Sequence, residues 1–345
     1  MEEKPITIVG GGLAGLTLGI GLRRRSVPVI IWEAGQYPRH RVCGEFVNGR
    51  GTEALGRLGL AESLAQAGAR TGTTAAFFCG RVGSPVRTLP EPALCLARYK
   101  LDALLARHFQ DEGGVLRAGQ RWQGDRNCEG CVSASGRRLG RGGGARWFGL
   151  KVHARDVEMA ADLEMHATAG GYVGVCRLGE GLVNICGLFK QTRGAGGSSP
   201  WEERLRGQPG TVLNERMGAA RFDETSFCSV AGISLRAERA GSRQECCVGD
   251  ALTMIPPVTG NGMSMAFEAA EVAVDPLAAY SRGGISWQRA RESIAGRCDQ
   301  LFRGRLEWAR WLQRMMLAGP ALSAAPLALI LRWEGLWRKM FERTR

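Results

Sequence analysis

The first 33 residues constrain the fold more than any other part of the chain. Ile6–Val9 is a short apolar run with β-branched residues, typical of a buried parallel strand, and it leads directly into the glycine-rich turn Gly10–Gly15. A helical pattern follows over Leu16–Arg25, and a second apolar strand over Val27–Trp32 ends at the acid Glu33. This order of strand, G-x-G-x-x-G turn, helix, strand and acid predicts a parallel α/β unit that binds a dinucleotide.

Each glycine of this turn has its own physical reason. Gly10 permits the tight turn, Gly12 lets the backbone approach a pyrophosphate, and Gly15 lets the helix pack closely on the strand. The helix amino terminus then offers free N–H groups and a positive dipole end to the phosphates, while Glu33 would accept hydrogen bonds from ribose hydroxyls. The residues expected to contact the nucleotide here are Gly10, Gly12, Leu13, Ala14, Gly15, Glu33 and Ala34.

A second glycine-containing segment lies far downstream. Cys246–Ala251 reads as a short apolar strand ending in Gly-Asp, and the run Pro256–Met263 precedes a helix over Ser264–Ala273. Together with the first turn, this segment resembles the FAD-dependent oxidoreductases of the para-hydroxybenzoate hydroxylase and geranylgeranyl reductase superfamily. The resemblance implies that Asp250 binds the ribityl chain and that the helix start directs N–H groups at the flavin pyrimidine edge. The implied cofactor residues are Gly249, Asp250, Gly260, Gly262 and Met263.

Two segments between these signatures fit the same superfamily. Pro38–Phe46 resembles the Cys-Gly loop beside the isoalloxazine of geranylgeranyl reductase-like members, and Ala97–Leu105 resembles the R-x-x-L-D-x-x-L helix start whose arginine contacts FAD. Cys43 is a weak candidate for chemistry, with a buried filler as the alternative, and the catalytic residues are otherwise unassigned. A charged loop residue such as Glu45 is usually solvated. The resemblance adds Arg41, Cys43, Gly44 and Arg98 to the cofactor site.

The predicted fold class is α/β, with a Rossmann-like FAD-binding domain on a parallel sheet, an antiparallel β-sheet substrate domain and C-terminal helices. Short strand-like runs without intervening helices predict the antiparallel sheet. They cover residues 147–154, 161–167, 172–177, 182–189 and 228–235, and helical character is expected over 199–213. The FAD-binding domain is expected over 1–72, 97–137 and 240–280, the substrate domain over 73–96 and 138–239, and a helical region over 281–345.

The chain departs from the superfamily in three places. Ser135 stands where aromatic hydroxylases carry the aspartate of Ala-Asp-Gly-Arg, which is linked to NAD(P)H use, so NAD(P)H as electron donor stays open. Gly171–Arg177 matches the prenyl reductase motif Y-x-W-x-F-P in part, at Tyr172, so a prenyl-lipid substrate does not follow from it. Val115–Cys131 is shorter than the strand-forming segment that normally precedes the position of Ser135. We therefore expect the third layer of the FAD-binding domain to be reduced.

These features favour an FAD-dependent oxidoreductase that acts on an apolar small molecule, prenyl- or polyketide-like. The Cys-Gly loop and the missing aspartate favour a reductase or dehydrogenase. Two alternatives stay open. One is an FAD-dependent monooxygenase, hydroxylase or halogenase-like, and the other is a flavin-binding protein with degenerate activity, because a broken local rule without a visible compensation is a warning.

The charge distribution bears on partners. The net charge is +13, and residues 282–345 carry 13 Lys and Arg against five Asp and Glu. No nucleic-acid-binding motif accompanies this charge, so nucleic acid is not an expected partner. Tryptophans and arginines beside the uncharged run 315–331 suit a peripheral membrane contact through 305–345. That run is short and holds two prolines, so the alternative is a helical hairpin that covers both domains.

The remaining side chains offer little other chemistry. The charged amino terminus and the eleven cysteines predict a cytoplasmic protein with free thiols, with membrane association as the further option. Cys128 and Cys131 form a single CxxC, and the histidines lack metal-binding spacing, so no metal is expected. His153 and His166 lie on predicted strands of the substrate sheet, where a packed histidine is more common than one that faces a cavity.

Overall fold

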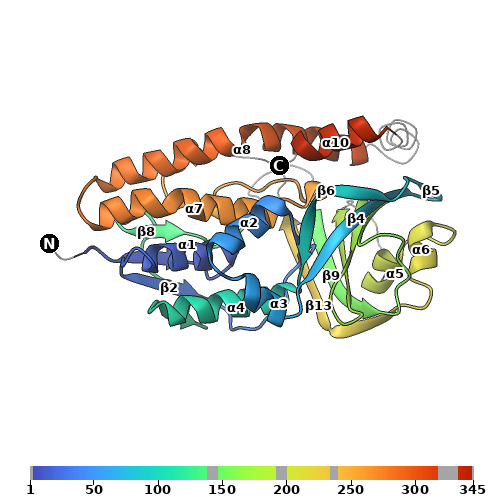
Figure 1. The fold of residues 1–345 in the computed structure, drawn as a ribbon, viewed down its shortest axis with the longest axis horizontal. Coiled ribbons are helices and arrows are strands. Elements are labelled where there is room, and N and C mark those ends of the chain that lie inside the picture. Colours follow the sequence, from blue (N-terminus) through green and yellow to red (C-terminus); the bar gives the residue numbers. More distant parts are fainter. Residues whose placement is uncertain (1–2, 138–146, 192–199, 234–239, 318–332, 344–345) are drawn as a thin grey trace.

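Two β-sheets and a layer of long helices make up the structure. The computed structural model describes residues 3–137, 147–191, 200–233, 240–317 and 333–343. Figure 1 shows a smaller α/β part on one side, a large curled sheet on the other, and helices along the upper edge of both. The predicted fold class is confirmed, with one correction to the second sheet given below.

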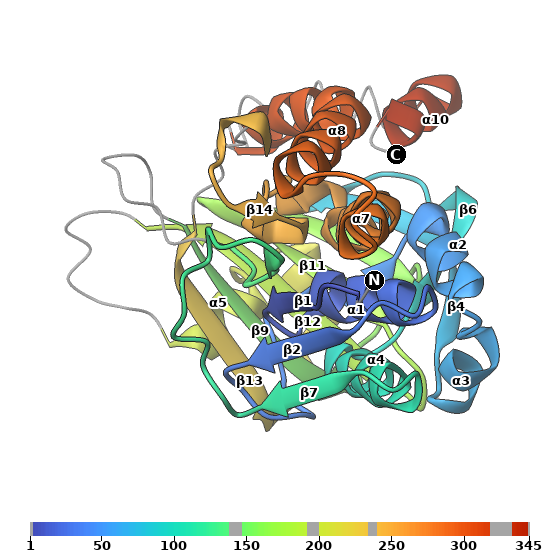
Figure 2. The same ribbon diagram turned by 90° about the vertical axis from the view of Figure 1, so that its left-hand side faces the viewer.

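The first sheet, sheet A, is wholly parallel and has five strands. Their order is β14 (Cys246–Cys247), β8 (Cys131–Ser133), β1 (Ile6–Val9), β2 (Val29–Glu33) and β7 (Val115–Ala118). β1 has the predicted bounds, and Glu33 is the last residue of β2. Because β14 joins this sheet through β8, the second signature is carried to the amino-terminal unit. Figure 2 shows these strands side by side.

Three helices that pack on one another cover one face of sheet A. α1 (Leu13–Arg23) follows the glycine turn, and α4 (Arg98–Asp111) packs on it. α7 (Gly262–Ser281), from much later in the sequence, also packs on α1. Two shorter helices, α2 (Gly49–Arg57) and α3 (Ala61–Gln66), precede α4. Alternate strand residues such as Ile6, Ile8 and Ile31 are fully buried beneath these helices, whereas Thr7 and Ile30 on the opposite face are half-buried.

The second sheet, sheet B, is mixed rather than antiparallel. Its order is β13 (Arg221–Ile233), β9 (Trp147–Arg155), β12 (Val183–Lys190), β11 (Gly171–Arg177), β10 (Leu163–Thr168), β4 (Arg70–Cys79), β6 (Arg87–Cys95) and β3 (Phe46–Val47), with β5 (Val82–Gly83) beside β4. β10 and β4 run parallel, whereas the other pairs are antiparallel. The exception arises because β10 joins the later strands to a hairpin formed much earlier in the chain.

The two faces of sheet B differ sharply. One face, which we call the outer face, carries Leu150, Val152 and Ile185 and packs with the short helices α5 (Trp201–Arg206) and α6 (Val212–Arg216). The opposite face, the inner face, carries Lys151, His153, Asn184 and Cys186, which strand register places side by side. Paired residues of antiparallel strands point to the same face, so Tyr172 and Leu188 also belong to the inner face.

The C-terminal region is helical, as predicted. α7 is followed by the long α8 (Trp287–Leu317), which runs along the upper edge of the molecule, and α10 (Glu334–Arg343) lies above the side of sheet B (Figure 1). Most of the apolar run 315–331 lies outside the described residues. Among the helices described, none is long and apolar enough to cross a membrane. Residues 119–130 contain no helix or strand, in keeping with a trimmed layer.

Candidate functional site

The glycine turn has the geometry that the sequence predicts. Gly10 has a φ of +115°, and a Cβ there would lie 2.4 Å from the carbonyl oxygen of Ala134. A Cβ on Gly15 would lie 2.0 Å from the Gly10 carbonyl oxygen, so neither position accepts a side chain. No side chain caps the start of α1, and its first turn carries no acid. The free N–H groups and the dipole of α1 are therefore available to an anion.

The second signature meets the first at Gly249. A Cβ on Gly249 would lie 2.7 Å from the Cβ of Ala14 in the first turn of α1. The next residue, Asp250, is exposed to solvent. Surrounding protein nevertheless raises its pKa by desolvation, against the lowering effect of Arg137 and Arg98. The carboxyl of Asp250 is therefore accessible to a ligand and lies directly after the contact with the first turn of α1.

Gly249→Ala tests this contact. Gly249 has a φ of +61°, and the added methyl would push α1 away from Asp250. The overpacking cost of about 1–3 kcal/mol corresponds to FAD binding weakened by about tenfold or more, measured by flavin fluorescence titration. Gly80→Ala is the matched control, because Gly80 has a φ of +60° and open space around its Cβ position. Equal loss of FAD in both variants would show that the left-handed backbone, not the contact with Ala14, limits binding.

Glu33 is held against the glycine turn. Its carboxylate accepts hydrogen bonds from the N–H groups of Gly11 at 2.9 Å and Gly35 at 2.8 Å, and Arg39 lies 2.6 Å away. Burial alone would raise the pKa of Glu33, but the Gly35 N–H and the nearby arginines outweigh it and lower the pKa. The Glu33 carboxyl is thus ionised at the end of β2, where the dinucleotide-binding pattern predicts a contact with the ribose hydroxyls. Ala34 follows it and is exposed.

Arg98 connects three parts of the expected site. Its Nε donates to Asp102 at 2.7 Å, its Nη1 lies 3.8 Å from Cys43 Sγ, and its Nη2 is 3.9 Å from the Cβ position of Gly12. Asp102 is fully buried and also pairs with Arg41 Nε at 3.3 Å. Two guanidinium groups and a single buried carboxylate leave one positive charge in excess beside the glycine turn, which suits a phosphate.

Cys43 lies between the start of α7 and the inner face of sheet B. Its thiol donates to Met263 Sδ at 3.5 Å in the first turn of α7, and its carbonyl oxygen accepts from Asn184 Nδ2 at 2.9 Å on the inner face. Gly44, the next residue, is exposed. The structure thus brings the loop of residues 38–45, the Cys43 loop, together with the start of α7, as the resemblance implies.

The start of α7 is shaped by glycine and asparagine. Gly260 has a φ of +64°, and a Cβ there would lie 1.9 Å from the ring of Phe46, so the turn before Gly262 requires glycine. Asn48 Oδ1 accepts from Ser264 Oγ at 2.6 Å, and the Asn48 amide also bonds to Asn261. Asn48 caps α2 by accepting from Gly51 N–H at 3.3 Å. The amino ends of α2 and α7 are therefore fixed to each other.

Sequence reasoning missed a buried ionic cluster on the inner face, and its expectation for Glu45 was wrong. Glu45 is fully buried, and its carboxylate lies 2.6 Å from His153 Nε2 and 3.4 Å from Lys151 Nζ. Lys151 Nζ is also 3.0 Å from His40 Nδ1. We call these four residues the Glu45 cluster. Glu45 has a φ of +59°, rare for a side chain of its kind. The alternating polar residues of the buried segment Trp147–Arg155 were the available signal.

The Glu45 cluster is charged at neutral pH. Burial acting alone would raise the pKa of Glu45, but the His153 hydrogen bond, the positive charges of His153 and Lys151 and the Arg98 N–H outweigh it and lower the pKa. Burial, reinforced by the positive charges of Lys151 and His153, lowers the pKa of His40 to about 4. His40 is therefore neutral at pH 7. It lies at the half-buried edge of the cluster, against the Tyr99 ring at 4.6 Å.

A hydrophobic cluster continues the inner face beyond the Glu45 cluster. Its members come from sheet B, from the segment after Asp250 and from the C-terminal helices, and they include Trp147, Met165, Tyr172, Leu188, Val258, Leu312 and Trp337. Within the described residues, the buried hydroxyl of Tyr172 has no hydrogen-bond partner. Buried hydroxyls are normally paired, so an unpaired one among apolar side chains is a candidate contact for a ligand.

The other sequence candidates lie elsewhere. His166 is on the outer face, 3.0 Å from Glu164 Oε2 and stacked on Phe78, so of the two strand histidines His153 alone faces the Cys43 loop. Cys128 is exposed and Cys131 buried, both as free thiols. In the described part of the chain, no group of His, Cys, Asp and Glu side chains is arranged to hold a metal.

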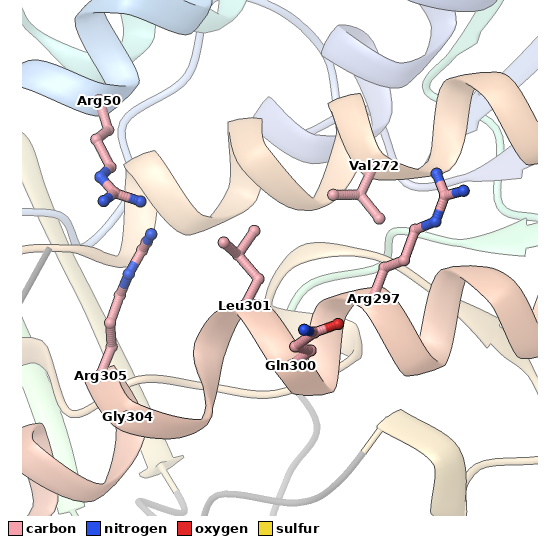
Figure 3. Close-up of a pocket in the computed structure, with 7 residues that line it drawn as sticks. All are labelled: Arg50, Val272, Arg297, Gln300, Leu301, Gly304 and Arg305. Carbon is pink, nitrogen blue, oxygen red and sulfur yellow. The ribbon is translucent and has the colours of Figure 1, made fainter.

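A groove of about 610 Å³ opens away from this site, between α7 and α8. Figure 3 shows Arg50, Arg297 and Arg305 around it, with Leu301 and Val272 on its floor. Arg305 forms a two-pronged pair with Glu268 at 2.7 and 2.8 Å, so the charge of Arg305 is compensated. None of the residues expected at the cofactor lines this groove, so it is a separate surface feature.

The residues present fit FAD. A dinucleotide needs N–H donors and positive charge for its pyrophosphate, an acid for its ribose, and polar groups for its flavin end. The uncapped α1, Arg98, Glu33 and Asp250 supply these groups around the glycine turn. The start of α7 carries no side-chain cap either, so its N–H groups and positive dipole end can stabilise negative charge.

Comparisons with known proteins agree with this geometry. The profile of the family described as "FAD binding domain" matches residues 3–154. A menaquinone reductase of Mycobacterium tuberculosis is 25% identical over 334 residues, covering 80% of this chain and 77% of that protein. Among solved structures, flavin-dependent brominase Bmp2 superposes with a TM-score of 0.79 at 17% identity, covering 100% of this chain and 93% of the brominase. The myxobacterial chondrochloren halogenase CndH gives 0.72 at 18% identity, covering 90% and 82%.

Proposed function

We propose that this chain, an FAD-dependent oxidoreductase whose residues 3–154 match the profile of the FAD binding domain, works as a reductase of an apolar small molecule of the prenylated quinone class. The observation that carries the proposal is that one face of sheet B joins the Glu45 cluster to a hydrophobic cluster with an unpaired buried phenol. The relatives named menaquinone reductase support this substrate class, and the Cys-Gly loop together with Ser135 favours reduction over hydroxylation.

The chain's own residues supply what a reductase requires besides electrons. FAD, when bound and reduced, supplies two electrons and one proton as a hydride. The second atom of the reduced bond then needs a proton, and Lys151 and His153 are buried groups of the inner face that can hold one. Glu45 fixes both through its two carboxylate oxygens. The apolar walls exclude water, which prevents loss of the reducing equivalents to solvent.

The test is whether reduced protein transfers electrons to the substrate without oxygen. Dithionite-reduced holoprotein is mixed anaerobically with a short-chain menaquinone, and flavin absorbance and product mass are followed. We expect reoxidation of the flavin and a product two hydrogens heavier. A monooxygenase, favoured by the structural likeness to halogenases, would instead stay reduced until oxygen is added. Label from ¹⁸O₂ in the product, with no anaerobic turnover, would overturn the proposal.

Tyr172→Phe separates substrate contact from folding. Removal of a buried hydroxyl that lacks a partner should leave the free energy of unfolding unchanged or raise it by about 1 kcal/mol. Loss of a hydrogen bond to a substrate oxygen should lower anaerobic turnover at low substrate by roughly fivefold. Urea denaturation and stopped-flow reoxidation measure the two effects. A destabilised variant with normal turnover would mean that the hydroxyl serves the fold and not the substrate.

A further inference from the structure

The outward side of α8 combines arginines with tryptophan. Between residues 297 and 314 the exposed charged side chains of α8 are Arg297, Arg303, Glu307, Arg310 and Arg314, four positive and one negative. No carboxylate within the described residues pairs with Arg303 or Arg310. Among the residues that the structure describes, acids therefore do not cover this side of α8, and its charge suits an anionic surface.

Helix geometry places an exposed tryptophan on the same side. Residues seven apart lie almost in line on an α-helix, so Arg297, Gly304 and Trp311 form one stripe and Arg303 and Arg310 a neighbouring one. Trp311 is 43% exposed and stacks on Trp308 with ring centroids 4.7 Å apart. A large aromatic residue between arginines is typical of a membrane interface, where the indole and the charged groups occupy the head-group region.

Exposed apolar residues gather at one end of this side. Five large hydrophobic residues are exposed in the described part of the chain, and four of them, Trp311, Trp333, Val82 and Val86, lie on or beside α8, α10 and the β4–β6 hairpin. The hairpin contacts α10 through Phe77 and Trp337, whose rings are 5.4 Å apart. Figure 1 shows α8 and α10 along the upper edge and β5 at the right-hand end of the molecule, near the level of α10. Most of the exposed apolar residues described therefore belong to the C-terminal helices and the hairpin that contacts them.

The groove beside α8 extends the positive surface. Glu268 pairs with both Arg305 at 2.7 Å and Arg50 at 3.7 Å, so one carboxylate faces two guanidinium groups, and Arg297 adds a further positive charge to the lining. Figure 3 shows Arg50 and Arg297 at opposite ends of the groove. A group that carries phosphate could approach them from solvent, next to the stripe that leads to Trp311.

We propose that this surface docks on an anionic lipid bilayer, with Trp311 and Trp333 in the head-group region and the arginines of α8 against lipid phosphates. A bilayer fits better than an acidic protein, because the apolar residues are separated by arginines and spread over two helices and a hairpin instead of forming one closed apolar patch. The proposal concerns peripheral contact alone, and it does not depend on which substrate the enzyme reduces.

Vesicle flotation of the full-length holoprotein tests the proposal. We expect binding to vesicles of phosphatidylcholine with 30% phosphatidylglycerol, weak binding to pure phosphatidylcholine, and release as salt increases. Arg303→Gln with Arg310→Gln should weaken binding by about fivefold for each charge removed. Trp311→Ser with Trp333→Ser should weaken binding to a similar degree. It should also reduce the binding that persists at high salt, because salt does not screen the apolar contribution of the tryptophans.

A matched control lies at the opposite edge of the molecule. Arg107→Gln with Arg117→Gln and Val115→Ser replaces exposed arginines and the fifth exposed hydrophobic residue, on α4 and β7. Figure 1 shows α4 far below α8. The control should bind vesicles as the parent does. Absence of flotation with anionic vesicles, equal loss in the control, or unchanged binding of both α8 variants would overturn the proposal. All substituted residues are exposed, so far-ultraviolet circular dichroism should be unchanged.

Discussion

Glu45→Gln lowers the free energy of unfolding by about 3–5 kcal/mol at pH 7, because it removes the charge that compensates a buried ammonium. Lys151 is fully buried. The other four lysines of the chain all lie in the described residues, and none of them is buried. Its other close partner is the neutral His40 ring. Urea denaturation followed by circular dichroism measures the change.

The double variant decides whether the charges or the volume matter. Lys151→Met alone should cost less than Glu45→Gln, because Glu45 keeps His153 and the Arg98 N–H at 3.0 Å. Glu45→Gln with Lys151→Met should be more stable than Glu45→Gln alone, since no unpaired ammonium remains. Additive losses in the double variant would show that the two residues do not act as a pair in the folded protein.

The sign of the pH dependence follows from the same contacts. The pKa of Glu45 is lowered in the folded state, so the carboxylate contributes stability above its ordinary unfolded pKa, and this contribution disappears as the pH falls through the folded value. The pKa of His40 is lowered to about 4, so acid also favours the unfolded chain between its ordinary pKa and that value. Below about pH 5 the stability of Glu45→Gln should therefore fall less steeply than that of the parent, whereas between pH 7 and pH 5 the His40 contribution acts in both proteins.

The amino-terminal unit could be predicted because its constraints are local. The turn from Gly10 to Gly15 needs glycine for reasons that involve its own strand and helix, so β1 has the predicted bounds and Glu33 ends β2. The contact between Gly249 and Ala14 could also be anticipated, because the order of the two signatures along the chain resembles a known family. The contact between Gly249 and Ala14 agrees with the FAD-binding arrangement that this resemblance implies.

The Glu45 cluster could not be predicted, because it depends on register between distant strands. Lys151 and His153 reach Glu45 since β9 presents its odd-numbered residues to the inner face, and a shift of one residue would have turned them outward. The parallel pairing of β10 with β4 has a similar origin, in a neighbour that lies far away in sequence. A charged loop residue is usually solvated, and the alternating polar residues Lys151 and His153 in a buried strand are the signal in the sequence that points the other way for Glu45.

Arg98→Met should abolish the retention of FAD on a desalting column. The guanidinium lies beside Gly12 and is the nearest positive group that the structure places at the glycine turn, with its charge maintained by Asp102. A lost charge-assisted hydrogen bond costs about 1.5–3 kcal/mol, which corresponds to roughly a 10- to 150-fold weaker affinity for FAD. Fluorescence titration of the apoprotein measures it.

Arg98→Met also removes one partner of the buried Asp102, and a second substitution separates this effect on the fold from the effect on FAD binding. Arg98→Met leaves the fully buried Asp102 with Arg41 as its remaining partner, so the fold should also lose stability. Asp102→Leu in the same chain removes the uncompensated carboxylate and should restore much of that stability. If Arg98 binds FAD directly, affinity stays low in the double variant although the fold is recovered. If affinity returns with stability, Arg98 acts on the cofactor through the packing of α4 and not as a ligand of the phosphates.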